Sequence, residues 1–294
     1  MASTQDLKRR VRSITNTRKL TRAMELVASA RLRRAQMRIE AMRPYADRML
    51  ELMAGVSQAA GAVRLPLLER RENVEAVAIV PITGDRGLAG AFNAQVLRRS
   101  FVLMREVQGA GQKALFFPSG KKAGSTLRFR RLEVGQAWSG FSDRPAFSDA
   151  QAMAHTLADA YTKGEVDRVV IVYNAFVSPL VQKVTVSEVL PVSTELLEGA
   201  PEDKPSHPVD FFFEPEPRQI LERLLPVYVE TELYRALLES AASFFGAQMT
   251  AMRNASKAAG ELIDTLTLAM NRARQAEITQ EILEVVAGAD ALTA

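Results

Sequence analysis

The sequence predicts an α/β domain with a Rossmann-like, mostly parallel sheet, placed between two long terminal helices that pair as an antiparallel coiled coil. Three observations support this fold class. The first 43 residues contain neither Gly nor Pro, residues 227–287 contain no Pro, and the segment between them alternates strand-like and helix-like stretches. A chain of 294 residues favours about two domains. We expect boundaries at 1–60, 74–192, 193–216 and 217–290.

The N-terminal segment, residues 1–60, has the pattern of an amphipathic helix, with Ser3 or Thr4 as a suitable N-cap. The apolar residues that we expect to form its stripe recur at spacings of four and three: Leu7, Val11 and Ile14, and then Leu20, Met24 and Val27. So narrow a stripe is typical of a coiled-coil seam. Pro44 is expected to kink the helix without ending it, because a helical pattern resumes after it.

The middle of the chain alternates strands and helices, which is the pattern of a mostly parallel sheet. We expect strands at 74–80, 113–119, 167–176 and 181–192. Helices are expected at about 92–107 and at 147–164. In the second of these, Ser148 and Gln151 have the spacing of a capping box, and Gly164 is a stop signal.

The C-terminal helix follows a polar, Pro-rich stretch at 199–210, within the expected linker 193–216. Leu233, Leu237 and Phe244 are expected to begin its seam. Farther along, the seam is expected to consist of small residues: Ala251, Ala255, Ala258, Ala259, Ala269, Ala273 and Ala276. Gly246 and Gly260 each cost about 1 kcal/mol in a helix interior, so packing has to hold the helix together at these positions.

Composition excludes several classes of site. Cys is absent, so disulfides, thiolate metal sites and thiol nucleophiles are ruled out. The two histidines, His155 and His207, are too few for a multi-histidine metal centre; we expect an ordinary helix histidine and a solvated one. No apolar run approaches the roughly 18 residues that span a bilayer, and no signal peptide is evident, which favours the cytoplasm.

A glycine-rich turn follows the first expected strand, at residues 83–90. Glycines in this position can let a phosphate approach the backbone amides. The spacing of Gly84, Gly87 and Gly90 is neither a dinucleotide fingerprint nor a P-loop. We therefore favour a structural turn held by hydrogen bonds of Asp85 and Arg86, and a nucleotide-binding α/β enzyme is kept as the alternative.

Two further segments could bind a partner. Residues 1–43 hold twelve basic and three acidic residues, a net charge of +9. A nucleic-acid-binding helix, a solvated basic face and an interface for an acidic protein all fit this charge. Near the other end, residues 271–281 place Arg274, Gln275, Thr279 and Glu281 within about two helical turns. This run is either a polar solvated tip or a contact surface.

Three separated motifs resemble the gamma subunits of F-type ATP synthases. They are Ile14–Ala28, the turn Asp85–Gly90 and the run Ala273–Ile282, with a weaker match at Phe213–Pro217. Their order and spacing agree with that family over essentially the whole chain. The absence of Cys rules out the dithiol insert of the plant plastid form and favours the bacterial type.

The resemblance implies a central rotor shaft, without catalytic residues or a cofactor of its own. One copy would stand inside a ring of three alpha and three beta subunits. Its α/β domain would lie against the epsilon subunit and the membrane c-ring, at the cytoplasmic face of the bacterial membrane as a peripheral subunit. Ion flow would turn the ring and the shaft, and the shaft would drive the beta subunits through their conformational cycle, with no nucleic acid and no small-molecule substrate of its own.

The resemblance also assigns contacts. Arg274, Gln275, Thr279 and Glu281 would lie against the beta subunit, as would Met24 from the N-terminal helix. Phe211, Phe213 and Glu214 would lie near the rotor ring at the foot. Many family members have Arg where this chain has Gln248, Asn where it has Ala258, and Gly where it has Ala91, so the first two positions lack polar contacts of the family pattern.

Overall fold

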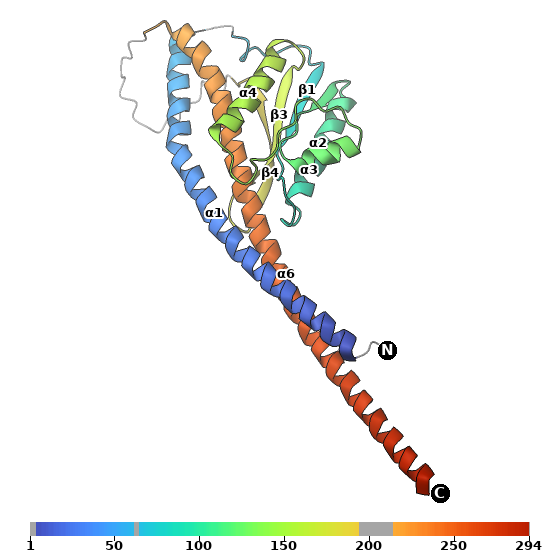
Figure 1. Cartoon of the computed structure of the whole chain (residues 1–294). Helices are drawn as coiled ribbons and strands as arrows, with labels where there is room; N and C mark the ends of the chain where they lie inside the picture. Colours follow the sequence, from blue (N-terminus) through green and yellow to red (C-terminus); the bar gives the residue numbers. More distant parts are fainter. Residues whose placement is uncertain (1–3, 62–64, 194–213, 294) are drawn as a thin grey trace. The chain divides into compact units, whose positions relative to one another are not determined.

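A computed structural model describes residues 4–61, 65–193 and 214–293, with side chains through 289 (Figure 1). Its elements in chain order are α1 (Thr4–Ala60), β1 (Ala76–Pro81), α2 (Phe92–Gly109), β2 (Lys113–Phe116), α3 (Lys121–Phe129), α4 (Phe147–Thr162), β3 (Arg168–Phe176), β4 (Gln182–Leu190) and α6 (Pro217–Thr293). The chain divides into two compact units. The sheet unit is Ser29–Gln248, and the two-helix unit combines Met1–Ala28 with Met249–Ala294. Each is described by itself.

The sheet unit contains a four-stranded sheet in the order β2-β1-β3-β4. Strand β1 pairs in parallel with β2 and with β3, whereas β4 is antiparallel to β3. The expectation of a mostly parallel sheet is therefore confirmed. The antiparallel strand is reached through a short hairpin, because only five residues separate β3 from β4.

Helices cover both faces of this sheet, as Figure 1 shows for α2 and α3 on one side and α4 and α6 on the other. Alternate residues of β1 point to opposite faces. Val77 and Ile79 join the core with α2 and α3, whereas Ala78 and Val80 join a larger core with α1, α4 and α6. The large core takes in Met53 of α1 and Leu233 of α6, both fully buried. The buried residues that the terminal helices give to this core lie at positions 49–56 of α1 and 221–237 of α6.

Both terminal helices pass through proline without ending. Pro44 lies inside α1 and Pro226 inside α6. The expected helix at 1–60 is therefore observed from Thr4 to Ala60, and α6 begins at Pro217. None of the described helices is both long enough and apolar enough to cross a membrane.

The two-helix unit pairs the start of α1 with the end of α6 in antiparallel order. Thr4 Oγ1 donates to Glu277 Oε2 at 2.7 Å, and Arg253 Nε donates to Glu25 Oε1 at 3.0 Å, so rising numbers on one helix meet falling numbers on the other. The antiparallel pairing expected for the helices is confirmed in this unit. Its described residues include only five in the buried class: Leu7, Glu25, Ala28, Met249 and Met252.

The seam of this unit differs from the expectation after Ile14. Leu20 and Val27 are exposed, by 62% and 52%, because steps of four and three from Ile14 lead instead to Arg18, Thr21, Glu25 and Ala28. On α6 the expected alanine seam is also partly wrong, since Ala258, Ala269 and Ala276 are exposed. The residues that are buried or half-buried at seam spacing mix large apolar side chains with small ones, two of them expected alanines: Met249, Met252, Ser256, Ala259, Ile263, Leu266, Met270 and Ala273.

Two local expectations in the sheet unit also need correction. Four residues separate helix α3 from β2, and this helix is not among the expected helices. The capping box at Ser148 and Gln151 is wrong. The helix begins at Phe147, and the Asp149 carboxylate accepts a hydrogen bond from Ala146 N–H at 2.7 Å. The stop at Gly164 agrees with its positive φ of 81°.

Candidate partner-binding surfaces

The glycine-rich turn after β1 is organised around the Asp85 carboxylate. Its Oδ1 accepts a hydrogen bond from Lys121 N–H at 2.9 Å, and its Oδ2 accepts from Gly140 N–H at 2.9 Å and from the Ser142 hydroxyl at 2.9 Å. Partial burial would raise the pKa of Asp85, but the hydrogen bonds from Lys121, Ser142 and Gly140 outweigh it and hold the pKa below its usual value. The carboxylate thus joins three segments of the sheet unit.

The same turn occupies the start of α3, where a phosphate would be expected to bind. Exposed amides at a helix N-terminus are the usual phosphate ligands. Here Lys121 N–H donates to Asp85, Lys122 N–H to the Gly84 carbonyl at 3.3 Å, and Ala123 N–H to Thr83 Oγ1 at 3.0 Å. All three amides are therefore used by the turn itself.

Gly120 allows the turn after β1 to approach the start of α3 closely. Its φ is +97°, and a Cβ built there would lie 2.1 Å from the Thr83 carbonyl oxygen. Any side chain at this position would push the turn away from α3. The site therefore needs glycine for both backbone conformation and space.

The other expected turn residues lie on the surface of the same loop. Arg86 Nη1 is 3.8 Å from Asp143 Oδ2, and the Arg86 carbonyl accepts a hydrogen bond from Asn93 Nδ2 at 3.1 Å. Gly90 has a positive φ of 57° and Gly87 is half-buried. Leu88 also has a positive φ, of 63°, and is 64% exposed. This loop presents an apolar side chain to the outside.

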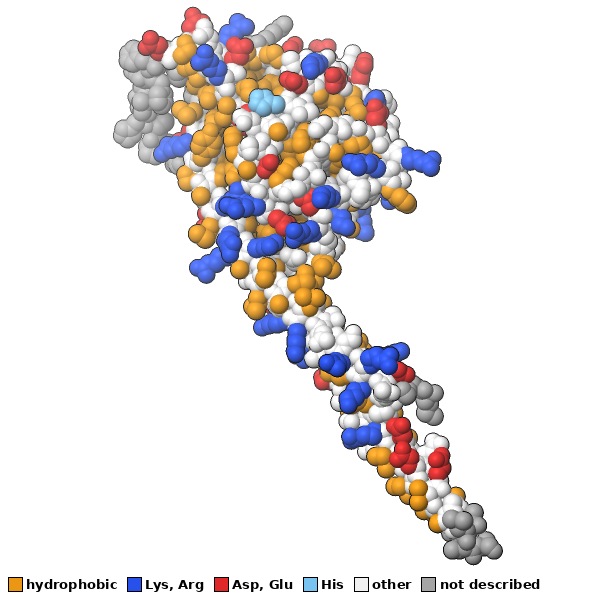
Figure 2. All heavy atoms as spheres, viewed as in Figure 1, with side chains coloured by type: hydrophobic (Ala, Val, Ile, Leu, Met, Phe, Trp, Pro, Cys, Tyr) orange, Lys and Arg blue, Asp and Glu red, His pale blue; other side chains and the backbone are white. Residues whose placement is uncertain are grey.

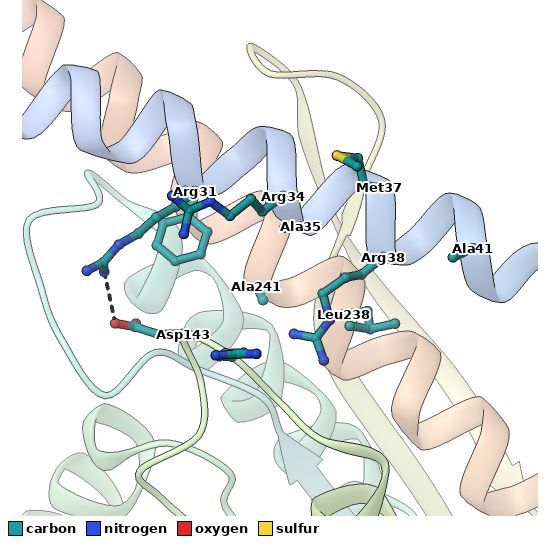
Figure 3. Close-up of a pocket in the computed structure, with 11 residues that line it drawn as sticks. Arg31, Arg34, Ala35, Met37, Arg38, Ala41, Asp143, Leu238 and Ala241 are labelled. Carbon is teal, nitrogen blue, oxygen red and sulfur yellow. Dashed lines mark hydrogen bonds and ion pairs between the residues drawn. The ribbon is translucent and has the colours of Figure 1, made fainter.

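A basic pocket lies in the sheet unit between α1, α6 and the loop that contains Asp143 (Figure 3). It encloses about 640 Å³. Its floor is apolar, with Leu238, Ala241 and Phe245 from α6, and its charged rim consists of Arg31, Arg34, Arg38, Asp143 and Arg144. Figure 2 shows Lys and Arg side chains gathered along α1 on this face of the unit.

Only part of the positive charge in this pocket is neutralised within the chain. Arg31 Nη1 lies 3.3 Å from Asp143 Oδ2, and Arg38 Nη2 donates to the Pro145 carbonyl and, at 3.2 Å, to the Tyr234 hydroxyl. Within the described residues, Arg34 and Arg144 make no side-chain hydrogen bond or ion pair. Four arginines against one aspartate leave a net charge of +3 around an apolar floor.

In the two-helix unit, the C-terminal candidates share one exposed stretch of α6. Arg274, Gln275, Thr279 and Glu281 are all exposed, and Thr279 Oγ1 donates to the Gln275 carbonyl at 2.8 Å. The described part of α6 beyond Glu277 lies past the start of α1 and is exposed throughout. Figure 2 shows acidic and hydrophobic side chains together over this part of α6.

Met24 does not join that group. It is half-buried and adjoins Glu25, which pairs with Arg253, whereas Arg274 is 21 residues farther along α6. That separation corresponds to about 30 Å of helix. The residues expected to contact beta therefore lie in two separate regions of the two-helix unit. Of the expected foot residues, Phe211 and Phe213 lie outside the described residues, and Glu214 is exposed.

The two histidines form no site in the described part of the chain. His155 is exposed on α4, with Nε2 at 3.4 Å from Glu230 Oε1, and His207 lies outside the described residues. Among the residues that the structure describes, no group of three His, Asp or Glu side chains could hold a metal ion.

Several residues of these surfaces were missed from the sequence. Ser142 and Asn93 support the turn, but Ser142 lies 57 residues from Asp85 and Asn93 belongs to the helix after the turn, so the sequence of the turn itself does not indicate them. Arg31, Arg34 and Arg38 recur at spacings of three and four, which places them on one helix face. That periodic signal was available. The seam position of Glu25 could also have been found by extending the spacing from Ile14.

Known proteins agree with these features over the full length. A family model described as ATP synthase matches residues 3–292. The ATP synthase gamma chain of Rubrobacter xylanophilus is 48% identical over 100% of both chains. The chain belongs to the ATP synthase gamma-chain family. A second relative, the ATP synthase gamma chain of Desulforamulus reducens, is 43% identical over 99% of this chain and 100% of its own.

Solved structures give the same result for the fold. A chain of the central stalk and c-ring structure of Tetrahymena thermophila mitochondrial ATP synthase is 25% identical, with a TM-score of 0.57, over 81% of this gamma-family chain and 99% of that chain. A chain of Euglena gracilis mitochondrial ATP synthase has a TM-score of 0.71 at 19% identity, over 98% of this chain and 94% of that one. The second match bears on the fold alone.

Proposed function

We propose that this chain is the central rotor shaft of an F-type ATP synthase. It couples ion flow through the membrane rotor ring to the conformational cycle of the catalytic beta subunits. One copy works with three alpha and three beta subunits, the epsilon subunit and the c-ring. It stands at the cytoplasmic face of a bacterial membrane as a peripheral subunit. Family membership over the whole chain supports this assignment.

The observation that carries the proposal is the exposed end of α6. After Glu277 meets Thr4, the described residues 278–288 lie beyond the first described residue of α1 and are all exposed. This stretch includes five exposed apolar side chains: Ile278, Ile282, Leu283, Val285 and Val286. An exposed apolar helix end marks a surface that another protein covers. A surrounding ring of subunits provides such a cover on all sides of a helix.

We also propose the contacts that the resemblance assigns, because they are consistent with this geometry. Arg274 and Gln275 contact a loop of the beta subunit, with Thr279 and Glu281 beside them. Met24 makes a second contact with beta, about 30 Å away along the pair of helices. Phe211, Phe213 and Glu214 are assigned to the foot, near the rotor ring.

The basic surface is proposed to bind acidic protein rather than nucleic acid. The Arg34 and Arg144 side chains lack partners within the described residues and adjoin apolar side chains of α6. That mixture suits a folded acidic partner, whereas phosphate backbones need charge alone. Under the nucleic-acid alternative, duplex DNA would bind with a steep salt dependence. Purified alpha–beta hexamer should remove any such binding if this face is a protein interface.

The chain is proposed to have no catalytic side chain and no cofactor, and Asp85–Gly90 to act as a structural turn. The amides that would hold a phosphate are bonded within the turn. Isothermal titration of the chain with ATP, ADP and NAD should give no binding heat. Saturable binding that is lost in Asp85→Ala while the protein stays folded would favour the enzyme alternative.

The rotary role is tested by locking the shaft to its ring. The chain has no Cys, so Gln275→Cys introduces its only thiol. A disulfide to a cysteine in the facing beta loop should abolish multi-site ATP turnover, and reductant should restore it. Any native thiols of the other subunits are removed first.

The last turns of α6 could uncoil and let the rest of the shaft turn despite the first crosslink. A second crosslink, from Met24→Cys to the beta surface facing it, prevents this. Full turnover with both crosslinks formed quantitatively would sink the rotary role. The matched control for the first crosslink is Gln275→Ser, which changes the side chain without allowing a crosslink.

A simpler test can be made first: a tagged chain should copurify with alpha and beta subunits.

A further inference from the structure

Charged residues interrupt the seam of the two-helix unit. Steps of four and three along α1 connect Leu7, Val11, Ile14, Arg18, Thr21, Glu25 and Ala28, which are all buried or half-buried except the exposed Arg18. Apolar residues occupy such positions in an ordinary coiled coil. Here Glu25 occupies one of them, and its side chain is only 7% exposed.

The Glu25 carboxylate is fully paired in the observed alignment. Arg253 Nε of α6 donates to Oε1 at 3.0 Å, and Arg22 Nη1 of α1 donates to Oε2 at 2.8 Å. The hydrogen bond from Arg253 lowers the pKa of Glu25 more than burial raises it, and Arg22 adds to the lowering. The group therefore stays ionised, and a buried charge of this kind is tolerated only while it is paired.

Residues on α6 make the neighbouring alignments unfavourable. A coiled coil slips most easily by seven residues, because the seam then matches again. The residues seven positions from Arg253 are Gly246 and Gly260. Neither has a side chain that could pair with Glu25, so either slip would leave a buried carboxylate without its cross-helix partner.

Arg18 adds a second discrimination. In the observed alignment its guanidinium lies over Gly260, where a Cβ would come within 3.4 Å of Arg18 Cζ. The slip that brings Gly246 to Glu25 would bring Arg253 to Arg18, so that two like charges would lie side by side along the edge of the seam. Gly260 thus leaves room for Arg18 in the observed alignment, whereas Arg253 would repel Arg18 in the slipped one.

We propose that Glu25 and Arg253 are positioning residues that fix the axial register of α1 on α6, with Arg18 and Gly260 as a second determinant. A slip of one heptad would move the helices by about 10 Å relative to each other. Met24 would then lie at a different distance from Arg274 and Gln275. The register claim stands without the proposed function, and only this last consequence rests on it.

Paired cysteines in the full-length chain read out the register. Thr4 and Glu277 are hydrogen-bonded, so cysteines at these two positions report the observed register through a short bis-thiol crosslinker. Thr4→Cys with Met270→Cys, and Thr4→Cys with Glu284→Cys, report the two slips of seven residues. The unaltered seam should give crosslinks only in the first pair.

The decisive variant is Glu25→Leu with Arg253→Leu, which replaces the charges by apolar groups. We expect an unchanged or higher melting temperature. We also expect the preference for the 277 pair to fall at least about tenfold, the factor that about 1.4 kcal/mol of discrimination provides. The matched control is Lys257→Leu with Glu261→Leu, an exposed pair at 4.0 Å on the same helix, which should keep the register.

A reversed arrangement separates register from general stability. Glu25→Arg with Arg253→Glu, Arg22→Gln and Arg18→Gln restores one opposite-charge pair across the seam, leaves no arginine at position 18 for the new Glu to meet after a slip, and should restore the single register. Crosslinking confined to the 277 pair in the Leu–Leu variant would overturn the proposal. So would equal crosslinking of all three pairs in the reversed variant while it melts normally.

Discussion

The sheet unit and the two-helix unit use the same two helices in opposite ways. In the sheet unit, α6 is buried on nearly every side from Leu221 to Phe245, and α1 contributes Met53 and Val56 to a large common core. In the two-helix unit, five described residues are buried and one of them is charged. The first arrangement favours a single rigid shape. The second leaves most of each helix available for contacts with other proteins.

The two units differ in how much stability is lost when a side chain is truncated. A residue in a filled core has many neighbours and leaves a cavity when it is truncated. A residue in a two-helix seam has few neighbours, and water fills the gap. Equivalent substitutions should therefore differ in cost by several-fold between the units.

The largest effect is expected in the sheet unit. Leu157 of α4 is fully buried, so Leu157→Ala should lower the free energy of unfolding by about 3 kcal/mol through lost contacts and a cavity. Chemical denaturation of the chain measures this. Leu180→Ala, at a position 69% exposed, is the control and should cost no more than about 0.5 kcal/mol. Similar costs for the two would mean that the core is not where the structure places it.

A smaller but still large effect is expected at the turn. Asp85→Ala removes the acceptor for Lys121, Gly140 and Ser142 and should lower stability by about 2 kcal/mol. Because the pKa of Asp85 is lowered in the folded state, its contribution is present above its unfolded pKa of about 4 and disappears as the pH falls through the folded value.

Denaturation at several pH values tests both parts of that prediction. The difference between Asp85→Ala and the unaltered chain should be constant near neutral pH and shrink below about pH 4. Arg86→Ala, at an exposed side chain 3.8 Å from Asp143, is the control. A difference that grows with acidity would have the wrong sign and reject the role of the carboxylate.

Much of the fold could be predicted because its signals are local. The lack of Gly and Pro in residues 1–43 predicts most of α1, and runs of β-branched residues predict β1, β3 and β4. Alanine was a poor guide to the α6 seam, because it is apolar yet too small to show which face is buried. The prediction placed Leu20 and Val27 on the apolar stripe of α1 because both are large and apolar, although regular spacing from Ile14 leads to Thr21 and Glu25.

The turn shows where local reasoning ends. Asp85 could be picked out from the sequence, but its partners lie 36, 55 and 57 residues away. Such contacts depend on the path of the chain between β1 and α4. The loop at Asp143 and Arg144 likewise meets the arginines of α1 only in the folded unit.

A third prediction sharpens the contrast within the two-helix unit. Leu266 is half-buried at a seam position, whereas Leu268 is 62% exposed. Leu266→Ala should lower local stability by about 1 kcal/mol, below the cost in a closed core, and Leu268→Ala by less than about half of that. Hydrogen exchange of amides in residues 255–275 gives the local stability. Greater loss in the Leu268 variant would mean that the seam is assigned to the wrong face.

The smallest effect on the chain by itself is expected at the end of α6. Ile282 is 57% exposed, so Ile282→Ser should change the stability of the chain by no more than about 0.5 kcal/mol. The yield of complex with alpha and beta subunits should fall nevertheless, because the substitution removes apolar surface that the partners cover. Ala276→Ser on the same exposed stretch is the control. An unchanged yield for Ile282→Ser would contradict the proposal that partner subunits cover the exposed apolar side chains at the end of α6.

The pairing of Thr4 with Glu277 has a consequence for synthesis of the chain. These residues are 273 positions apart, so α1 leaves the ribosome long before its partner exists. Contacts of such sequence separation form late, since a long loop has to close first. Until then α1 has to remain soluble as a lone helix or coil, and the net charge of +9 in its first 43 residues keeps it hydrated and self-repelling. The charge that we propose to meet an acidic partner thus first protects the nascent chain.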